Sequence, residues 1–217
     1  VPYYIAQIYY LQGRYAEVIA YVPELLDTAT TKRVPELAKV LGESYFRKGK
    51  FKEALPYLKK YESSVKVLQR AENYQMGYTL YSLKNYDDAV DYLIKTTNID
   101  DSLGQNAYYH IGDCYVKLEN KQNARNAFGQ AAKIDLDKTI QEDALYNYAK
   151  LSYELSFNPY GEAIKAFQQY LKKYPNAAHA DDAYGYLVNL FLTSKDYKSA
   201  LEAIDNIKVL TPELKQA

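Results

Sequence analysis

The strongest candidates for metal chemistry in this chain are His110 and Cys114, which lie four residues apart. On a helix that spacing places both side chains on one face, as two metal ligands would require. A structural zinc site needs four ligands, and no second pair accompanies them. With two histidines and one cysteine, neither a catalytic triad nor an internal disulfide is indicated. We predict a packed histidine, a buried thiol, and a chain with no metal, no cofactor and no enzymatic activity.

Acidic residues are the other candidates for chemistry. Asp87–Asp88 and Asp181–Asp182 suggest paired carboxylates, but adjacent positions on a helix point in different directions. Both pairs also fall near predicted helix N-termini, where negative charge is stabilised. Asp135–Asp137 has the spacing of a calcium loop, but such a loop needs glycine at Ile140 and an acid at Tyr146. We therefore interpret all of these acids as structural.

The charge balance excludes several classes of partner. There are 27 basic and 27 acidic residues, so the chain lacks the long-range field typical of nucleic-acid binders. No apolar run approaches the roughly 18 to 20 residues that cross a bilayer, so no direct membrane insertion is expected. The glycines form no phosphate-binding spacing. A hydrophobic share of 48% predicts a folded chain, in which the 26 tyrosines are the outlying feature.

The elements that position these residues recur along the chain every 35 to 39 residues. Gly42 precedes Ala54 by twelve residues, with a Lys48–Lys50 break between them. On two helices joined by a tight turn, this spacing places the glycine and the alanine where the helices cross. The second-helix position recurs as Val18, Ala54, Ala89, Ala124, Ala163 and Ala200. The first-helix position recurs as Ala6, Gly42, Gly77, Gly112, Ala149 and Val188, the fifth pair being two residues further apart because residues 156–159 enlarge the turn.

A period of this length with two helices per period predicts an all-α solenoid of about six helical hairpins. The turn between the helices of a hairpin carries an aromatic residue in most copies: Tyr15, Phe51, Tyr86, Tyr160 and Tyr197, with Lys121 as the departure. We predict helices over residues 2–12, 15–28, 34–48, 50–63, 65–83, 85–98, 103–118, 121–134, 138–155, 159–174, 177–194 and 196–210.

On these residues the sequence resembles the tetratricopeptide repeat (TPR) family over essentially its whole length. The alternation of small, aromatic and proline residues typical of the family is fullest in the fifth copy, at Ala163, Phe167 and Pro175. Val18 and Val188 depart from the small residues that the family places at the crossings. The resemblance implies a right-handed TPR superhelix.

The resemblance also implies one array over residues 1–217. We expect it to be a fragment of a longer array, because Pro2 to Leu11 reads as the middle of a first helix. Thr211–Leu214 reads as a helix start. The expected repeats are 1–33, 34–64, 65–100, 101–136, 137–176 and 177–210, with the start of a further helix at 211–217. The last helix carries Ile204, Ile207 and Leu210, which need a cover, so a homo-oligomer through exposed terminal repeats is a possible arrangement.

Function in a solenoid is expected on the concave face lined by the first helices. Projecting the helical period outward from the crossings places many tyrosines there, and exposed tyrosines favour recognition of a protein or peptide ligand. Lys39 is followed by Glu43, which would repel the C-terminal carboxylate that some TPR proteins bind. The predicted partner-binding residues are Tyr3, Tyr10, Lys39, Arg47, Tyr74, Tyr78, Tyr81, Tyr109, Tyr146 and Tyr153.

A second resemblance concerns location. The stretch 163–175, with Ala180 and Ala183–Tyr184, is similar to bacterial cell-envelope TPR proteins of the outer-membrane barrel-assembly and Tol-Pal-associated types. It favours a non-catalytic scaffold in the periplasm or cell envelope, with the cytoplasm as the alternative. The alternative function is a carbohydrate-binding module, since the same rings can stack on sugars.

Overall fold

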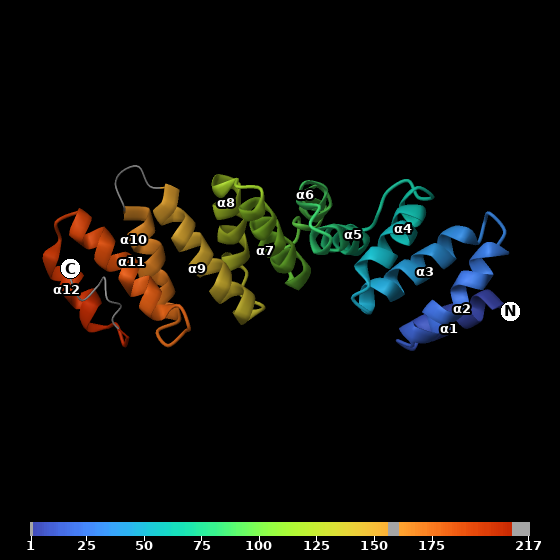
Figure 1. The fold of residues 1–217 in the computed structure, drawn as a ribbon, viewed down its shortest axis with the longest axis horizontal. Helices are drawn as coiled ribbons and strands as arrows, with labels where there is room; N and C mark the ends of the chain where they lie inside the picture. The colour runs from blue at the N-terminus through green and yellow to red at the C-terminus, as the bar shows by residue number, and fades with distance from the viewer. Residues whose placement is uncertain (1, 156–160, 210–217) are drawn as a thin grey trace. The chain divides into compact units, whose positions relative to one another are not determined.

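The computed structural model describes residues 2–155 and 161–209, and over these residues it contains helices and no strands (Figure 1). This confirms the predicted all-α fold. The α-helices of the described residues are α1 (Pro2–Leu11), α2 (Tyr15–Asp27), α3 (Val34–Arg47), α4 (Phe51–Glu62), α5 (Arg70–Ser82), α6 (Tyr86–Leu93), α7 (Ser102–Lys117), α8 (Lys121–Lys133), α9 (Lys138–Leu155), α10 (Gly161–Lys173), α11 (Ala180–Thr193) and α12 (Tyr197–Asp205). A short 3-10 helix, η1 (Ile94–Thr96), follows α6.

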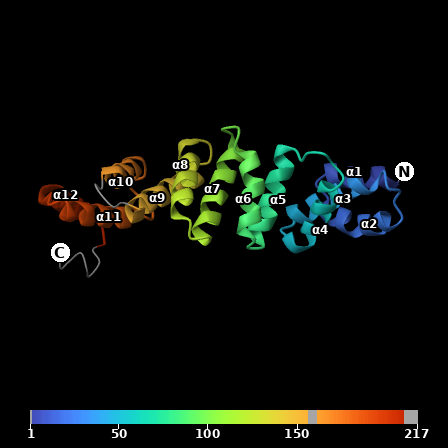
Figure 2. The ribbon, with the colours of Figure 1, turned by 90° about the horizontal axis from the view of Figure 1, so that it is seen from above.

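The chain divides into two compact units: unit 1 is residues 1–99, with α1 to α6, and unit 2 is residues 100–217, with α7 to α12. Within each unit every helix packs on the next one along the chain. The first helices of neighbouring hairpins are also in contact: α1 contacts α3, and α7 contacts α9. This nearest-neighbour packing, which is visible from above in Figure 2, defines a solenoid.

Small residues lie at the helix crossings, as the spacing predicts. A Cβ atom added to Gly77 would lie 2.7 Å from Cγ of Leu93, and one added to Gly112 would lie 2.8 Å from Cδ1 of Phe128. Ala89 and Ala124, on the opposing helices α6 and α8, are fully buried. Glycine on the first helix and alanine on the second therefore allow the two helices of these hairpins to approach closely, whereas the crossings of the first and last hairpins accommodate the fully buried Val18 and Val188.

The tight turns inside the hairpins share one backbone geometry. One residue in each of five described turns has a positive φ, between 57° and 70°, a conformation that glycine adopts most readily. The residue is glycine in the first two hairpins and a charged residue in the others, and the set is Gly13, Gly49, Lys84, Glu119 and Lys195. Each turn reverses the chain with the same geometry, which keeps the hairpins alike.

Several predicted helix ends were wrong by more than two residues. The fifth helix begins at Arg70 rather than 65, because Gln69 and Glu72 form a capping box there. The sixth ends as an α-helix at Leu93, after which the chain tightens into η1. The eleventh begins at Ala180, three residues late, and the last ends at Asp205 rather than 210. The predictions for residues 156–160 and 210–217 lie outside the described residues.

A recurrent contact ties the start of a first helix to the segment that follows the second helix of the same hairpin. In α5, Nε of Arg70 donates to the Thr96 carbonyl oxygen over 2.8 Å. In α11, Asp181 accepts hydrogen bonds from the backbone N–H groups of Lys208 and Val209, each 3.1 Å long. These bonds satisfy backbone groups that the end of a helix would otherwise leave without partners.

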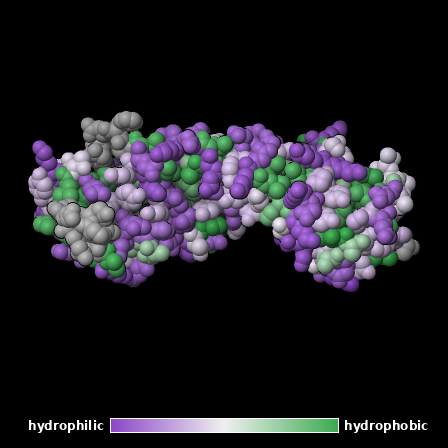
Figure 3. Space-filling model, in the orientation of Figure 1, coloured by the Kyte–Doolittle hydropathy of each residue, from purple (hydrophilic) through white to green (hydrophobic). Residues whose placement is uncertain are grey.

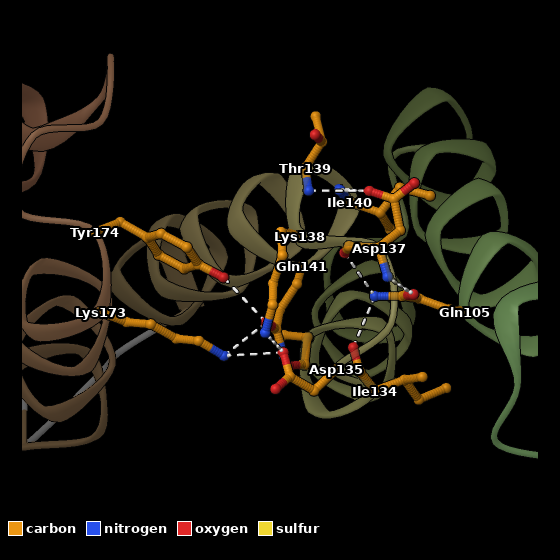
Figure 4. Close-up of polar contacts among 11 residues, drawn as sticks. Gln105, Ile134, Asp135, Asp137, Lys138, Thr139, Ile140, Gln141, Lys173 and Tyr174 are labelled. Atoms are coloured by element: carbon orange, nitrogen blue, oxygen red, sulfur yellow. Dashed lines mark hydrogen bonds and ion pairs between the residues drawn. The ribbon is translucent and has the colours of Figure 1, made fainter.

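In the hairpins that begin with α7 and α9, a buried glutamine of the first helix makes the contact to the segment at the end of the second helix (Figure 4). The Gln105 amide donates to the carbonyl oxygens of Ile134 and Asp137, over 2.7 and 3.0 Å. Gln141 accepts from Nζ of Lys173 over 2.6 Å and from the Tyr174 hydroxyl over 3.1 Å. Because glutamine offers a donor and an acceptor, each side chain can fasten two groups at once.

Asp135 and Asp137 have structural roles in this segment. Asp137 caps α9 by accepting from the backbone N–H groups of Thr139 and Ile140. Asp135 pairs with Lys138 and with Lys173. The acidic pairs Asp87–Asp88 and Asp181–Asp182 lie in the first turns of α6 and α11, which confirms their predicted positions.

Candidate functional site

The candidate site consists of the predicted residues on the first helices of each unit. In residues 1–99 they are Tyr3 and Tyr10 on α1, Lys39 and Arg47 on α3, and Tyr74, Tyr78 and Tyr81 on α5. In residues 100–217 they are Tyr109 on α7, and Tyr146 and Tyr153 on α9. All of the tyrosines except Tyr146 are half-buried, and Arg47 is exposed.

Side chains on this face join neighbouring first helices. The Tyr10 hydroxyl on α1 donates to the Glu43 carboxylate on α3, and Tyr109 on α7 donates to Asp143 on α9 over 2.7 Å. Burial and the acceptor carboxylate raise the pKa of Tyr10, so its hydroxyl stays protonated and able to donate. Within each unit, neighbouring first helices are thus joined by side-chain hydrogen bonds between repeats.

Lys39 and Glu72 make the third contact of this kind, an ion pair between α3 and α5. Glu72 is 8% exposed and also accepts from the Tyr61 hydroxyl over 3.0 Å and from the Gln69 backbone N–H over 2.7 Å. Burial opposes ionisation of Glu72, but these donors outweigh it, and the pKa of Glu72 lies below its ordinary value. The lysine is therefore engaged by a buried carboxylate.

The ion pair of Lys39 lies between two helices and not along α3. Lys39, Glu43 and Arg47 are spaced four residues apart, a spacing that allows pairs within one helix. Instead Lys39 binds Glu72, and Glu43, 5% exposed, accepts from Tyr10. The partners come from neighbouring repeats because stacking brings the faces of α1, α3 and α5 together.

Six aromatic rings form a continuous cluster in unit 1, which we call the unit 1 aromatic cluster. Tyr78 is at its centre, with ring centroids 5.9 Å from Phe46, 5.6 Å from Phe51 and 5.8 Å from Tyr81. Most pairs are edge-to-face or tilted, geometries that favour aromatic contact. Every ring is half-buried. The members are Phe46, Phe51, Tyr74, Tyr78, Tyr81 and Tyr86.

The remaining predicted tyrosines lie apart from one another. In unit 1, the Arg33 guanidinium lies 5.5 Å from the Tyr3 ring centroid, within the range of a cation–π contact. In unit 2, Tyr153 packs on Tyr186, with ring centroids 5.0 Å apart. Tyr109 contacts Phe128 with a separation of 5.7 Å. The structure therefore brings together only the tyrosines of α5.

Tyr146 differs from the expectation of an exposed ring. It is 9% exposed, because the His179 ring stacks on it at 4.2 Å and Tyr170 lies 5.5 Å away. His179, the N-cap residue of α11, is half-buried. Tyr146 is therefore part of the hydrophobic core of unit 2.

Sequence reasoning missed Glu72, Tyr61 and Asp143 as members of this face. Glu72 completes a capping box with Gln69, but the usual pattern begins with Ser, Thr, Asp or Asn, so Gln69 gave no clear signal in the sequence. Tyr61 and Asp143 carry no local signal, because their partners are 11 and 34 residues away.

The candidate metal pair is part of the core. Cys114 is fully buried, and burial lowers the pKa of His110 to about 4. Over the described residues no three of His, Cys, Asp or Glu gather as a metal site would require.

None of the described helices is long and apolar enough to span a bilayer. In the view of Figure 3, hydrophilic and hydrophobic residues are interspersed over the surface.

Helical hairpins that cross at small residues and stack side by side define an α-solenoid repeat protein. Sequence models of the tetratricopeptide repeat match residues 73–102, 105–138 and 143–177. The human protein DnaJ homolog subfamily C member 7 is 28% identical over 115 residues, which are 52% of this chain and 22% of that protein. The match thus spans about a fifth of that relative's length.

Solved structures agree on the fold. MamA is 20% identical with a TM-score of 0.58, over 76% of this chain and 91% of MamA. YrrB, described as a TPR protein with an unusual peptide-binding site, is 16% identical with a TM-score of 0.60, over 85% of this chain and 89% of YrrB. A tetratricopeptide repeat protein from Parabacteroides merdae is 16% identical with a TM-score of 0.57, over 94% of this chain and 76% of that one. The chain contains tetratricopeptide repeats, and over the described residues it has the fold of such repeats.

Proposed function

We propose that the chain is a non-catalytic scaffold that binds a segment of a partner protein on the face formed by its first helices, with the unit 1 aromatic cluster as the main contact. The tetratricopeptide repeats of the chain support a scaffold for protein interaction. The single observation that carries the choice of surface is the cluster itself, six touching rings that are all half-buried.

The physical case for this surface has two parts. Tyrosine and phenylalanine rings offer large apolar area at low entropic cost, and aromatic residues are enriched where binding energy concentrates. The contacts that join α1 to α3 and α3 to α5 keep the face in one shape before a ligand arrives. A preorganised face loses less entropy on binding.

The buried charges around Lys39 favour an uncharged segment beside them. Lys39 is paired with Glu72, and Glu43 accepts from Tyr10, so neither group is available to a ligand without breaking a contact. A carboxylate ligand would have to displace Glu72 from Lys39. A segment with aromatic or aliphatic side chains requires no such exchange, and an extended peptide or an amphipathic helix could present them.

The test is affinity selection of a displayed random peptide library on the purified chain, followed by measurement of the selected peptides in solution. Tyr78→Ala should weaken binding at least tenfold, since it removes the central ring, whereas Tyr197→Ala, on the exposed surface of α12, should leave binding unchanged. Tyr78→Phe tests whether the ring or the hydroxyl matters. Selected peptides that bind Tyr78→Ala as well as the parent chain would contradict this surface.

The alternative of a carbohydrate-binding module has its own readout. Binding on a glycan array that is lost in Tyr74→Ala or Tyr78→Ala would favour a sugar ligand. Absence of binding on the array would count against a sugar ligand and would leave a segment of a partner protein as the proposed ligand.

For location, we propose the bacterial cell envelope. The proposal is supported by the similarity of residues 163–175, with Ala180 and Ala183–Tyr184, to envelope TPR proteins. Fractionation of source cells with an antibody against the chain tests it. Recovery in the cytoplasmic fraction alone would contradict an envelope role.

A further inference from the structure

A cleft of about 460 Å³ opens in unit 2 between the second helices α8 and α10, with the first helix α9 at its floor. The floor is formed by the buried Leu145 and by the half-buried ring of Tyr148. Exposed polar side chains of α8 and α10 form the walls. This volume is in the range of sites that hold small organic molecules, and an apolar floor with a few polar groups is typical of such sites.

Arg125, in one wall of this cleft, occupies a position that is aliphatic in every other hairpin. The position directly follows the crossing residue of the second helix. Ile19 packs there in the cluster that contains Leu37 of α3, and Ile164 in the cluster formed with α11, so the position faces the next first helix. Packing alone therefore favours an apolar residue over an arginine. The residues equivalent to Arg125 are Ile19, Leu55, Val90, Ile164 and Leu201.

The guanidinium of Arg125 is incompletely paired. Its Nη1 donates to one carboxylate oxygen of Glu162 over 3.1 Å, and the Tyr148 hydroxyl donates to the other oxygen over 3.0 Å. Nε of Arg125 is buried and has no acceptor among the described residues. A buried donor without a partner costs free energy, so the stability of the chain does not explain this arginine.

A second departure from the repeat pattern lies one helical turn further along α8, on the same side of the helix. Gly129 stands in the helix interior, where glycine is less favourable than alanine. A Cβ atom added to it would lie 3.1 Å from Cδ2 of Tyr148, so the missing side chain leaves room above the floor of the cleft. The equivalent residues of the other hairpins are Pro23, Lys59, Ile94, Gln168 and Asp205.

The charges around the cleft favour a ligand with one negative charge. The lining contains two cations, Arg125 and Lys133, and one anion, Glu162, which leaves one net positive charge. The ion pair with Glu162 engages Nη1 of Arg125, whereas Nε and Nη2 lie together on the other side of the guanidinium. That pair of donors matches the two oxygens of a carboxylate.

We propose that this cleft binds a carboxylate carried on a short apolar body, as in a small organic acid. A small rotation of the Arg125 side chain presents Nε and Nη2 to the two carboxylate oxygens, which gives the buried donor the acceptor it lacks. The exposed Lys133 adds a second positive charge, and the apolar body lies on Leu145 and the Tyr148 ring. The site lies on the second helices of unit 2 and does not depend on the peptide-binding face proposed above.

Titration of the isotope-labelled chain with hydrocinnamate, followed by NMR, tests the proposal. The signals of the Arg125 side-chain N–H and of the Gly129 and Leu145 backbone amides should shift. Hydrocinnamamide has the same body without the charge and should bind about tenfold more weakly. Inorganic phosphate should also bind more weakly, because it has no body to cover the apolar floor. Acetylated dialanine with a free C-terminus distinguishes the source, since binding tighter than that of hydrocinnamate would indicate the carboxylate of a peptide.

Four variants separate a ligand site from a structural contact. Arg125→Leu restores the aliphatic residue of the other hairpins, so it should abolish hydrocinnamate binding. Its melting temperature should stay the same or rise, because the unpaired donor is gone and Glu162, which loses its partner, is 57% exposed. Arg125→Lys keeps the charge without the paired donors and should weaken binding about fivefold. Glu162→Gln removes the competing anion and should tighten binding. Lys172→Leu, at an exposed position of α10, is the control and should bind like the parent chain.

Several outcomes would overturn the proposal. One is the absence of shifts at the Arg125 and Gly129 signals up to the solubility limit of hydrocinnamate. Equal binding of hydrocinnamamide, or tighter binding of phosphate, would show that the cleft does not select a carboxylate on an apolar body. Binding by Arg125→Leu equal to that of the parent chain would exclude Arg125 as the ligand contact. A lower melting temperature of Arg125→Leu, together with no binding by the parent chain, would assign Arg125 to joining α8 and α10.

Discussion

Gln105 and Asp137 exchange two hydrogen bonds across the fourth hairpin: the Gln105 amide donates to the Asp137 carbonyl oxygen, and the Asp137 backbone N–H donates to Oε1 of Gln105 over 2.8 Å. Gln105 is fully buried, and its amide also reaches the Ile134 carbonyl oxygen. One side chain thus satisfies three backbone groups in the segment between α8 and α9, and it positions the start of α9.

Replacing Gln105 with leucine should destabilise the chain by about 2 to 3 kcal/mol, because buried backbone donors and acceptors lose their partners. Chemical denaturation measures the change, and amide exchange should quicken near Asp137. Gln122→Leu, at an exposed site of the same hairpin, is the matched control and should change stability by less than about 0.5 kcal/mol. Equal effects of the two substitutions would contradict the role of Gln105.

Gly112→Ala should lower the free energy of unfolding by about 1 to 3 kcal/mol, because the new methyl group would lie 2.8 Å from the Phe128 ring. Gly161→Ala serves as the control, since nothing lies within 4 Å of a Cβ atom there and its φ is not positive. Thermal melts of both variants make the comparison. A neutral Gly112→Ala would mean that the crossing of α7 and α8 can widen freely.

Glu72→Gln should destabilise the chain at neutral pH by about 1 kcal/mol, a modest figure because Lys39 is partly exposed to solvent. The pKa of Glu72 is lowered on folding, so its contribution is present above the ordinary value of 4.5 and is lost as pH falls through the folded value. The difference between parent and variant should therefore shrink in acid. A difference that stays constant below pH 4.5 would show that the ionised form is not what matters. Glu53→Gln, on the exposed side of α4, controls for the loss of a charge.

Stability should fall between pH 6.5 and pH 4 because of His110. Burial lowers its pKa from 6.5 to about 4, so in this window the unfolded chain binds a proton that the folded chain does not. The loss is up to about 3 kcal/mol and is complete below the folded pKa. Unfolding titrations on His110→Gln should show a flatter pH profile over this range than those on the parent chain. A profile in the variant as steep as that of the parent would assign the acid sensitivity to other groups.

The inner architecture of each hairpin was predictable from the sequence because it depends on local spacing. Gly77 lies twelve residues before Ala89, and this spacing places a small residue at the crossing of the two helices independently of the neighbouring repeats. In the structure the Leu93 side chain lies next to Gly77. Helix ends were less predictable where side chains decide them. The capping box of Gln69 and Glu72 begins α5 five residues later than periodicity alone suggested.

The candidate site was predictable only in part. Helical projection found the rings of α5 that touch one another, Tyr74, Tyr78 and Tyr81. It did not find that Lys39 binds Glu72, and it expected an exposed Tyr146 where His179 covers the ring. In both cases the partner lies 33 residues away on another hairpin.

The sequence by itself determined that this protein is a row of helical hairpins, since a period near 36 residues and the small residues at each crossing are properties of one repeat and its nearest neighbours along the chain. Only the tertiary structure decided which tyrosines gather and which charges pair. The physical reason is that contacts between hairpins depend on how their faces align when stacked, and side chains far apart in sequence meet only then.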